Sequence, residues 1–285
     1  MTWTWPGGSL SLAPSLGRVL QVTLRGVPAF WTNPSAPDWN VGGDRLWLGP
    51  ERDWFWGDSA ALSDHVVPAS IDPGTWRLVS SDATAVSLAA DTVLTHRRTT
   101  EETSVGLTRT IKLVDASPDR VVYETRTAVT VHSGQPVSAW SIVSVPLSGT
   151  VTAALRGPLT YRDYLSPIDP ARLTVSEGRL SLRLTGEKMM KVGVSPDAFA
   201  GSLDYTRPVD GGALRVERVV DVRPDLRYCD LPVGVDPTPQ GDALQIFEDD
   251  GHYGGYAELE HHSPAAAVGS PVVDVCRTAV SVIGS

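Results

Sequence analysis

Residues 40–56 read NVGGDRLWLGPERDWFW and mix large aromatic rings with fixed charges in one short segment. A hydrophobic core would exclude the charges, and an ordinary solvated loop would not need the rings. The composition therefore indicates the wall of a binding pocket, with Asp44, Arg45, Trp47 and Glu51 as candidate ligand-binding residues. The alternative is a strand edge and loop tied by a polar network, with the tryptophans closing one end of the fold.

A second set of reactive side chains lies in YAELEHHSP, residues 256–264. Glu258 and Glu260 project from the same face if this segment is a strand, because they are two residues apart. A carboxyl group close to a second carboxylate tends to have a raised pKa, which suits proton transfer. His262 follows them directly as a possible ligand contact. The alternative is an exposed strand face with ordinary solvated glutamates.

Two further histidines are candidate proton donors. His96, in LTHRRTT, lies on a probable strand and could point into a sheet face. His252, in the turn EDDGHYGG, stands a few residues before the glutamates, and a hairpin could fold it back toward them. A lone histidine is more often a surface residue or a satisfied core residue, so both assignments are hypotheses.

The acidic turn near residue 250 raises the question of a metal site. Glu248, Asp249, Asp250 and His252 form a set of ligands that calcium or a transition metal could use. The chain has no HExxH, no EF-hand spacing and no CxxC pair. It also has no GxSxG, no GxGxxG after a strand and no Walker loop. We therefore expect an acidic turn without a metal, and a protein without a cofactor.

Strands are expected to position these residues, because the dominant sequence period is two. In GRLSLRLT, Leu180, Leu182 and Leu184 alternate with polar residues, which places the leucines on one strand face. No long stretch combines a 3.6-residue apolar stripe with helix caps. The sequence predicts an all-β sandwich or barrel in a single domain over residues 1–285. Further strands are expected at residues 84–90, 106–114, 121–131, 138–147 and 213–222.

Composition limits the possible partners. The chain has 285 residues and a formal net charge of −9, which argues against nucleic acid as a partner. No apolar run reaches the length needed to span a bilayer, so no membrane partner is expected. The N-terminus lacks a signal-peptide pattern, and the two cysteines are interpreted as reduced thiols, which predicts a cytoplasmic protein. The sequence does not indicate an oligomeric state.

Four phrases of the sequence form a recognisable series, namely GGDRLWLGPE (42–51), GLTRTIKL (106–113), TAVTVHSGQPVSAWSIVSVPL (127–147) and IFEDDGHYGGYAELEHHSP (246–264). Taken in order, they resemble the galactose mutarotase-like superfamily, which contains the aldose 1-epimerases. The resemblance is strongest to uncharacterised bacterial members with a GGDRLW-type motif and covers about residues 40–265. It implies a single-domain β-supersandwich with a concave sheet face that holds a monosaccharide or the end of a glycan.

The resemblance also implies roles for the reactive residues. In aldose 1-epimerases a glutamate near the C-terminus takes the proton of the anomeric hydroxyl, and a histidine protonates the ring oxygen. By this resemblance Glu258 or Glu260 is the expected base. The Asn-His pair of the epimerases is absent from SAWSIVSVPL, where Trp140 lies near the expected histidine position. His96 or His252 is therefore the expected substitute for the acid.

These roles lead to a functional expectation. Tryptophan covers the C–H face of a sugar, while carboxylates and guanidinium groups bind vicinal hydroxyls, so the charged aromatic segment would position the substrate beside Trp140 and His262. We expect a cofactor-independent acid/base isomerase, resembling aldose 1-epimerase, that acts on a small-molecule carbohydrate. One alternative is a non-catalytic carbohydrate-binding protein. Another is a fold recruited for a lyase or cyclase-type proton transfer on a non-sugar metabolite.

Overall fold

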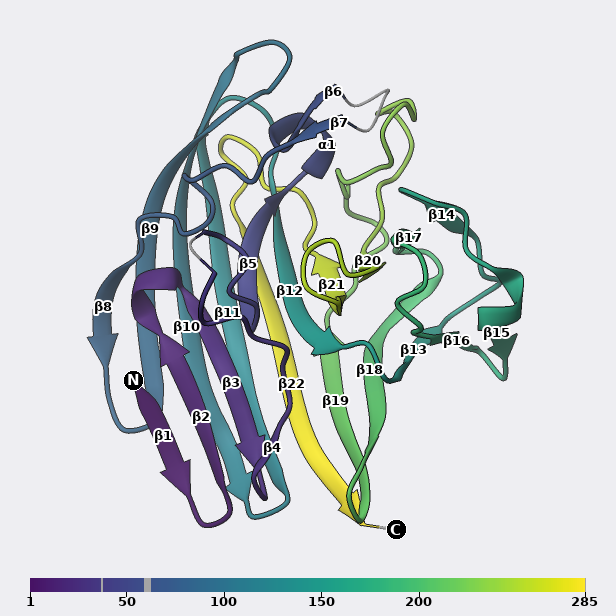
Figure 1. Ribbon diagram of the computed structural model, residues 1–285. Coiled ribbons are helices and arrows are strands. Elements are labelled where there is room, and N and C mark those ends of the chain that lie inside the picture. The colour runs from purple at the N-terminus through teal and green to yellow at the C-terminus, as the bar shows by residue number, and fades with distance from the viewer. Residues whose placement is uncertain (37, 59–62, 285) are drawn as a thin grey trace.

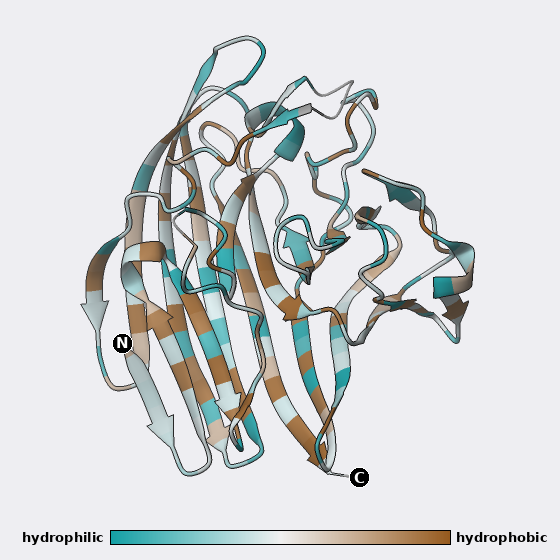
Figure 2. Ribbon diagram, viewed as in Figure 1, coloured by the Kyte–Doolittle hydropathy of each residue, from teal (hydrophilic) through white to brown (hydrophobic). Residues whose placement is uncertain are grey.

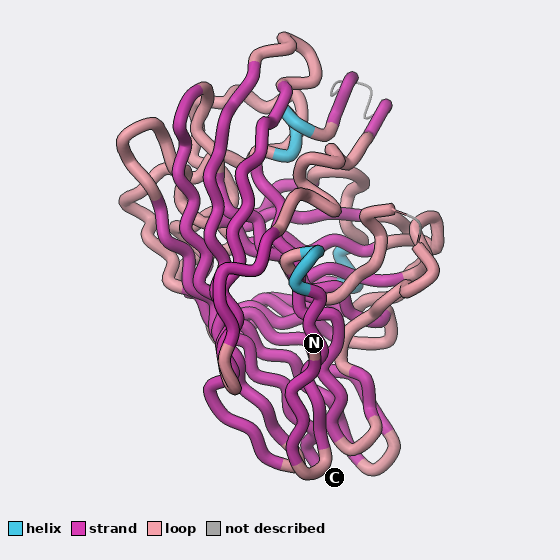
Figure 3. The backbone as a smooth tube through the Cα atoms, turned by 90° about the vertical axis from the view of Figure 1, so that its left-hand side faces the viewer, coloured by secondary structure: helices cyan, strands magenta, loops and turns pink. Residues whose placement is uncertain are grey.

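The computed structural model describes residues 1–36, 38–58 and 63–284. Within these residues the strands form two ten-stranded antiparallel sheets that pack against each other (Figures 1 and 3). The predicted all-β supersandwich is confirmed. The described helices are single turns, namely α1 (Glu51–Trp54) and the 3₁₀ helices η1 (Pro14–Leu16) and η2 (Pro170–Arg172).

The first sheet carries the aromatic and charged segment of the sequence analysis on its central strands. Its order is β1-β2-β3-β5-β12-β21-β20-β17-β14, with β4 paired to β3. Its strands are β1 (Thr2–Trp5), β2 (Gly8–Ala13), β3 (Arg18–Leu24), β4 (Val27–Pro28), β5 (Asp44–Gly49), β12 (Ser138–Pro146), β14 (Tyr161–Asp163), β17 (Met190–Val194), β20 (Leu244–Glu248) and β21 (Tyr256–His262).

The second sheet is built from longer strands and backs the first. Its order is β15-β16-β13-β18-β19-β22-β11-β10-β9-β8. A separate hairpin pairs β6 (Trp56–Asp58) with β7 (Ser63–His65). The strands of the second sheet are β8 (Arg77–Ser81), β9 (Ala85–Thr95), β10 (Glu102–Ser117), β11 (Arg120–Ser133), β13 (Thr150–Leu155), β15 (Leu173–Ser176), β16 (Arg179–Arg183), β18 (Phe199–Val209), β19 (Gly212–Val220) and β22 (Val272–Gly284).

The strands predicted from the period-two pattern are present in the structure. Every segment predicted as a strand overlaps an observed one, and the leucines of GRLSLRLT are buried as expected. Alternating apolar and polar residues are visible along the long strands in Figure 2. The main hydrophobic cluster joins residues of both sheets, such as Leu10 of β2 and Ile111 of β10. Burial of this shared face is what holds the two sheets together.

The central strands of the first sheet depart from simple alternation. All residues of β5 and β21 are buried, as are all of β12 except its last residue. One face of these strands packs on the second sheet, and connecting segments cover the other face. In Figure 1 these segments include α1, β6 and β7 at the upper end of the molecule. In the part of the chain that is described, no helix is long and apolar enough to cross a membrane.

Candidate functional site

The floor of the candidate site is the face of the first sheet that points away from the second sheet. Trp47 of β5 lies opposite Trp140 of β12 in the strand register. Further along the same sheet, Glu258 of β21 is paired with Phe247 of β20. Phe247 is in turn paired with Lys191 of β17. Side chains at paired positions share a face, so three distant parts of the chain contribute to one floor.

A cavity lies on this floor. Aromatic rings supply most of its wall, and a few charged groups converge at its base. The lining residues are Trp39, Arg45, Trp47, Glu51, Trp56, His65, Trp140, Leu165, Met189, Lys191, Phe247, Tyr253, Tyr256 and Glu258.

Arg45 and Glu258 form a buried ion pair on the floor. The Arg45 Nη2–Glu258 Oε1 distance is 2.5 Å, and both side chains are almost inaccessible. The Arg45 guanidinium also lies 4.2 Å from the ring centroid of Trp47, a favourable cation–π position. Burial raises the pKa of Glu258 above its usual value, and the positive charge of Arg45 opposes this shift. Glu258 is therefore fixed in position by Arg45, and its proton affinity is higher than that of an exposed glutamate.

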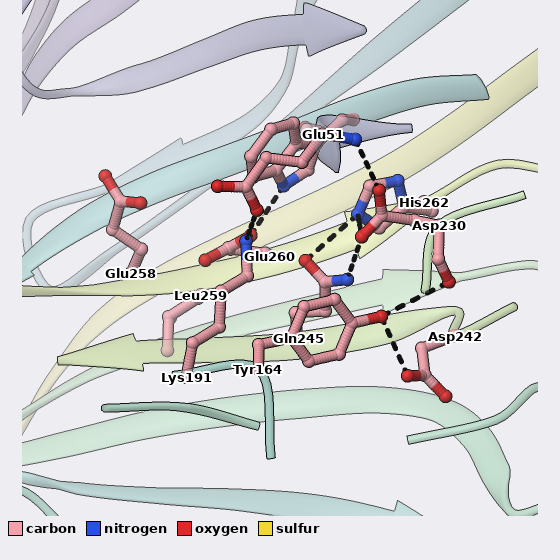
Figure 4. A network of polar contacts seen from close by, with 12 residues as sticks. Glu51, Tyr164, Lys191, Asp230, Asp242, Gln245, Glu258, Leu259, Glu260 and His262 are labelled. Carbon is pink, nitrogen blue, oxygen red and sulfur yellow. Dashed lines mark hydrogen bonds and ion pairs between the residues drawn. The ribbon is translucent and has the colours of Figure 1, made fainter. Parts of the chain in front are cut away.

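Lys191 links the floor to the segment that covers it (Figure 4). Its Nζ lies 2.7 Å from Glu51 Oε2, 3.1 Å from Glu260 Oε2 and 4.2 Å from the ring centroid of Trp140. Trp140 Nε1 donates to the same Glu260 oxygen at 2.6 Å. Burial raises the pKa of Glu260 to about 8, against the lowering effect of Lys191. Burial alone would lower the pKa of Lys191, but Glu260 and Glu51 raise it, so this lysine stays cationic.

A second set of polar contacts lies beside the cavity on the same sheet face (Figure 4). His262 Nε2 lies 3.1 Å from Gln245 Oε1, and Gln245 Nε2 in turn donates to Asp230 Oδ2. The other oxygen of Asp230 accepts the backbone N–H of Glu51 at 2.6 Å, which anchors the start of α1. Burial lowers the pKa of His262 well below its usual value, so its ring is neutral. The network fixes the Glu51 segment relative to the sheet.

The aromatic wall is tied together across the cavity mouth. The Trp39 ring lies 5.6 Å from the rings of both Trp47 and Tyr253 in edge-on geometry. Asn40 Nδ2 donates to the Tyr253 carbonyl at 2.6 Å, which joins the segment around residue 40 to the turn before β21. Such edge-on pairs contribute about 0.5–1.5 kcal/mol each beyond their buried area. The wall is therefore largely formed before a ligand arrives.

His65 is the histidine that lines the cavity. It lies at the end of β7, half-buried, with its Nε2 3.8 Å from Glu51 Oε1. Its ring packs beside Trp56 at a centroid distance of 4.7 Å. Burial lowers the pKa of His65, while Glu51 partly offsets this effect. The site thus combines a carboxylate from the sheet floor with an imidazole from the covering hairpin.

Residues 35–133 match a family of unknown function, DUF6786. This segment contains β5, α1 and the hairpin that carries His65, but it spans less than half of the chain. A search of curated proteins finds no match to the chain.

Solved structures give a clear similarity over the whole chain. An Escherichia coli protein with a provisional assignment as an aldose 1-epimerase has a TM-score of 0.65 at 12% identity, covering 99% of this chain and 98% of its own. A galactose mutarotase-like protein from Lactobacillus casei has a TM-score of 0.59 at 10% identity, covering 98% and 99%. A GalM/aldose epimerase homologue from C. elegans has a TM-score of 0.51 at 9% identity, covering 100% and 99%.

The chain has the galactose mutarotase-like fold. The resemblance inferred from the four sequence phrases is thus confirmed at the level of fold. Sequence identities of 9–12% to these structures indicate a shared fold but not a shared function. The chemistry of this mutarotase-like chain therefore depends on its own side chains.

The mutarotase-like structure brings together five of the site residues expected from the sequence, namely Arg45, Trp47, Glu51, Trp140 and Glu258. Two others lie on the same sheet face but do not line the cavity. Glu260 is covered by Trp140 and Lys191, and His262 stacks against Trp140 with ring centroids 5.3 Å apart.

Asp44, His96 and His252 lie away from the floor. Asp44 points between the sheets, where its carboxylate accepts from Arg109 Nη2 and from the Tyr123 hydroxyl, both at 2.8 Å. His96 lies next to Asp53, outside the cavity, with an Nε2–Oδ1 distance of 3.6 Å. His252 is exposed on the turn before β21.

The acidic turn has a structural role for two of its carboxylates. Glu248 is paired with Arg172 and accepts the Gly186 N–H at 2.6 Å. Asp249 accepts backbone N–H groups from within its own turn, including those of Tyr253 and Gly255. In the described part of the chain, no group of three or more His, Cys, Asp and Glu side chains is placed to hold a metal ion.

Sequence reasoning missed two polar residues of the cavity, Lys191 and His65. A signal for Lys191 was present, because a single lysine in the apolar run MMKVGV must find a partner when that strand is buried. His65 had no comparable signal, since its position depends on how the β6–β7 hairpin folds over the sheet. Two aromatic wall residues, Tyr253 and Tyr256, were also not named as site residues, whereas Trp56 lies in the segment interpreted as the pocket wall.

Proposed function

We propose that the protein binds a sugar or sugar-like ring in this cavity and exchanges its anomers by acid/base catalysis, as an aldose 1-epimerase does. Glu258 is the base and His65 is the acid. The aromatic wall covers the C–H face of the ring, and Arg45, Glu51 and Lys191 receive its hydroxyls. No cofactor is needed for this reaction.

The proposed reaction balances with these two groups. Glu258 removes the proton of the anomeric hydroxyl, the O–H electrons form the C=O bond of an aldehyde at C1, and the bond between C1 and the ring oxygen breaks. His65 delivers a proton to the released ring oxygen. Rotation next to the aldehyde exposes its other face, and reclosure returns the protons by the reverse steps. The catalyst ends in its starting state.

The observation that carries the proposal is the position of Glu258. It is a buried carboxylate with a raised pKa, on the floor of a cavity walled by aromatic rings. A raised pKa strengthens a base that must work near neutral pH, and perturbed groups of this kind gather at functional sites. Glu260 shares the burial, but Trp140 and Lys191 contact its Oε2 and it does not line the cavity.

A second candidate function is sugar binding without turnover. It is favoured by the close contact between Arg45 and Glu258, because one carboxylate oxygen of the base is already engaged. Catalysis then depends on the other oxygen. The two functions share the pocket and differ only in whether the anomers exchange.

Anomer exchange measured by NMR tests the proposal directly. We expect the protein to accelerate the exchange of at least one aldose in a panel that includes glucose, galactose, mannose, xylose and arabinose. Calorimetric titration of the same panel measures binding. Binding without accelerated exchange would support the second candidate, and absence of both would refute the two together.

The pH profile provides an independent prediction. The active form has Glu258 unprotonated and His65 protonated. Activity should rise with pH through the raised pKa of Glu258 and fall as pH passes the lowered pKa of His65. We therefore expect a bell-shaped profile of kcat/KM. An alkaline limb that persists unchanged in His65→Asn would assign the acid to another group.

A further inference from the structure

A second compartment adjoins the proposed sugar cavity on its outer side. It opens to the surface and shares five lining residues with the inner cavity, namely Trp56, His65, Leu165, Met189 and Tyr253. Its remaining lining residues are Ser166, Asp250 and His252. The charged floor residues Arg45, Lys191 and Glu258 belong to the inner cavity alone.

The outer compartment has the two kinds of surface that a sugar ring requires. The aromatic side chains of Trp56 and Tyr253 line it as well as the inner cavity. Ser166, Asp250 and His252 offer a hydroxyl, a carboxylate and an imidazole, which are suited to hydrogen bonds with sugar hydroxyls. The His252 ring stands edge-on to Tyr253 with centroids 4.6 Å apart, so the polar and aromatic parts are adjacent.

The turn that presents these groups is held in one conformation. The Asp249 carboxylate accepts N–H groups of Gly251 at 3.2 Å, Tyr253 at 3.0 Å and Gly255 at 2.8 Å. Asn40 binds the Tyr253 carbonyl from the opposite side of the mouth. A surface fixed in this way loses little conformational entropy when a ligand binds.

We propose that the outer compartment is a second sugar subsite, so that the preferred ligand is a reducing disaccharide or the reducing end of a longer glycan. This inference rests on the proposed function. The reducing ring occupies the inner cavity with its anomeric centre at Glu258. The next ring lies between Trp56 and Tyr253 and reaches Ser166, Asp250 and His252. The base and acid act only on the inner ring.

Calorimetric affinities for sugars of the two sizes test the subsite. Lactose, maltose and cellobiose are compared with glucose and galactose on the wild-type protein. We expect at least one disaccharide to bind about 10-fold more tightly than either monosaccharide. Ser166→Trp, which fills the outer compartment, and His252→Ala, which removes one polar contact, should abolish or reduce this gain. Monosaccharide affinity should stay within about 2-fold in both variants. His132→Ala, at an exposed histidine on β11, is the matched control.

Three outcomes would overturn the inference, and they are distinguishable. If monosaccharides bind but no disaccharide binds more tightly, the second subsite is refuted while the proposed function stands. If the gain is present but survives Ser166→Trp, the second ring lies elsewhere. If sugars of neither size bind, the proposed function itself fails and the subsite fails with it.

Discussion

Glu258→Gln is expected to lower the rate of anomer exchange by roughly 10²–10⁴-fold, the usual contribution of a positioned general base. The amide cannot take the proton of the anomeric hydroxyl, but its oxygen still accepts the hydrogen bond that Arg45 donates. Sugar affinity should therefore change little. NMR exchange rates and calorimetric titration on the same preparation separate the two effects.

Glu102→Gln is the matched control, because Glu102 is an exposed glutamate at the start of β10. Glu260→Gln is the informative comparison. Glu260 bonds to Trp140 and Lys191, so its loss should disturb the floor and weaken binding together with the rate. Wild-type exchange in Glu258→Gln, with exchange abolished in Glu260→Gln, would transfer the role of base to Glu260.

Asp44→Ala is expected to destabilise the fold by about 3–5 kcal/mol, because it leaves the Arg109 charge buried without its partner. Asp44 and Arg109 are both fully inaccessible, and the Tyr123 hydroxyl also donates to Asp44. The free energy of unfolding in urea measures the loss. The double variant Asp44→Leu/Arg109→Met removes both charges and should recover much of it.

The same variant separates a structural role of Asp44 from a ligand-binding one. Asp44 lies between the sheets, so folded Asp44→Ala protein should bind sugar with wild-type affinity, whereas Arg45→Ala should weaken binding. Asp197→Ala, at an exposed aspartate, controls for loss of one carboxylate at the surface. Unchanged stability with a loss of sugar affinity would show that Asp44 acts on the ligand.

Lys191 has a defined physical role in the proposed site. It is a buried cation held by two carboxylates, one on the floor and one at the start of α1. The ion pair between Lys191 and Glu51 connects the covering segment to the sheet. The ion pair with Glu260 opposes the rise in the pKa of Glu260 that burial causes. A buried charge with such partners is costly to remove and restricts how the pocket can rearrange.

The sequence predicted that the adjacent residues Asp44 and Arg45 both bind the ligand, but in the structure only Arg45 lines the cavity. Asp44 and Arg45 are neighbours on β5, and successive strand residues point to opposite faces. Only one of them can line the pocket, and strand alternation alone excludes a shared role. The choice of Arg45 follows from the position of the second sheet, which receives Asp44 through Arg109 and Tyr123.

Glu258 and Glu260 show that residue spacing predicts the face of a strand but not which residue on that face lines a pocket. Their spacing predicts a shared face, and the structure has both on the same side of β21. Their environments nevertheless differ, because Trp140 and Lys191 cover Glu260 while Glu258 lines the cavity. Spacing defines the face of a strand, but the neighbouring strands and loops define which part of that face a ligand reaches.

By itself the sequence determined the all-β class, the positions of the long strands and the unusual mixture of rings and charges in residues 40–56. These properties are local, because a period of two depends only on nearby residues. Only the tertiary structure decided which of the expected residues line the pocket and added Lys191 and His65 to them. Glu258 meets Arg45 across 213 positions of the chain, and Lys191 meets Glu51 across 140. Contacts at such separations depend on strand order and register, which no local pattern encodes.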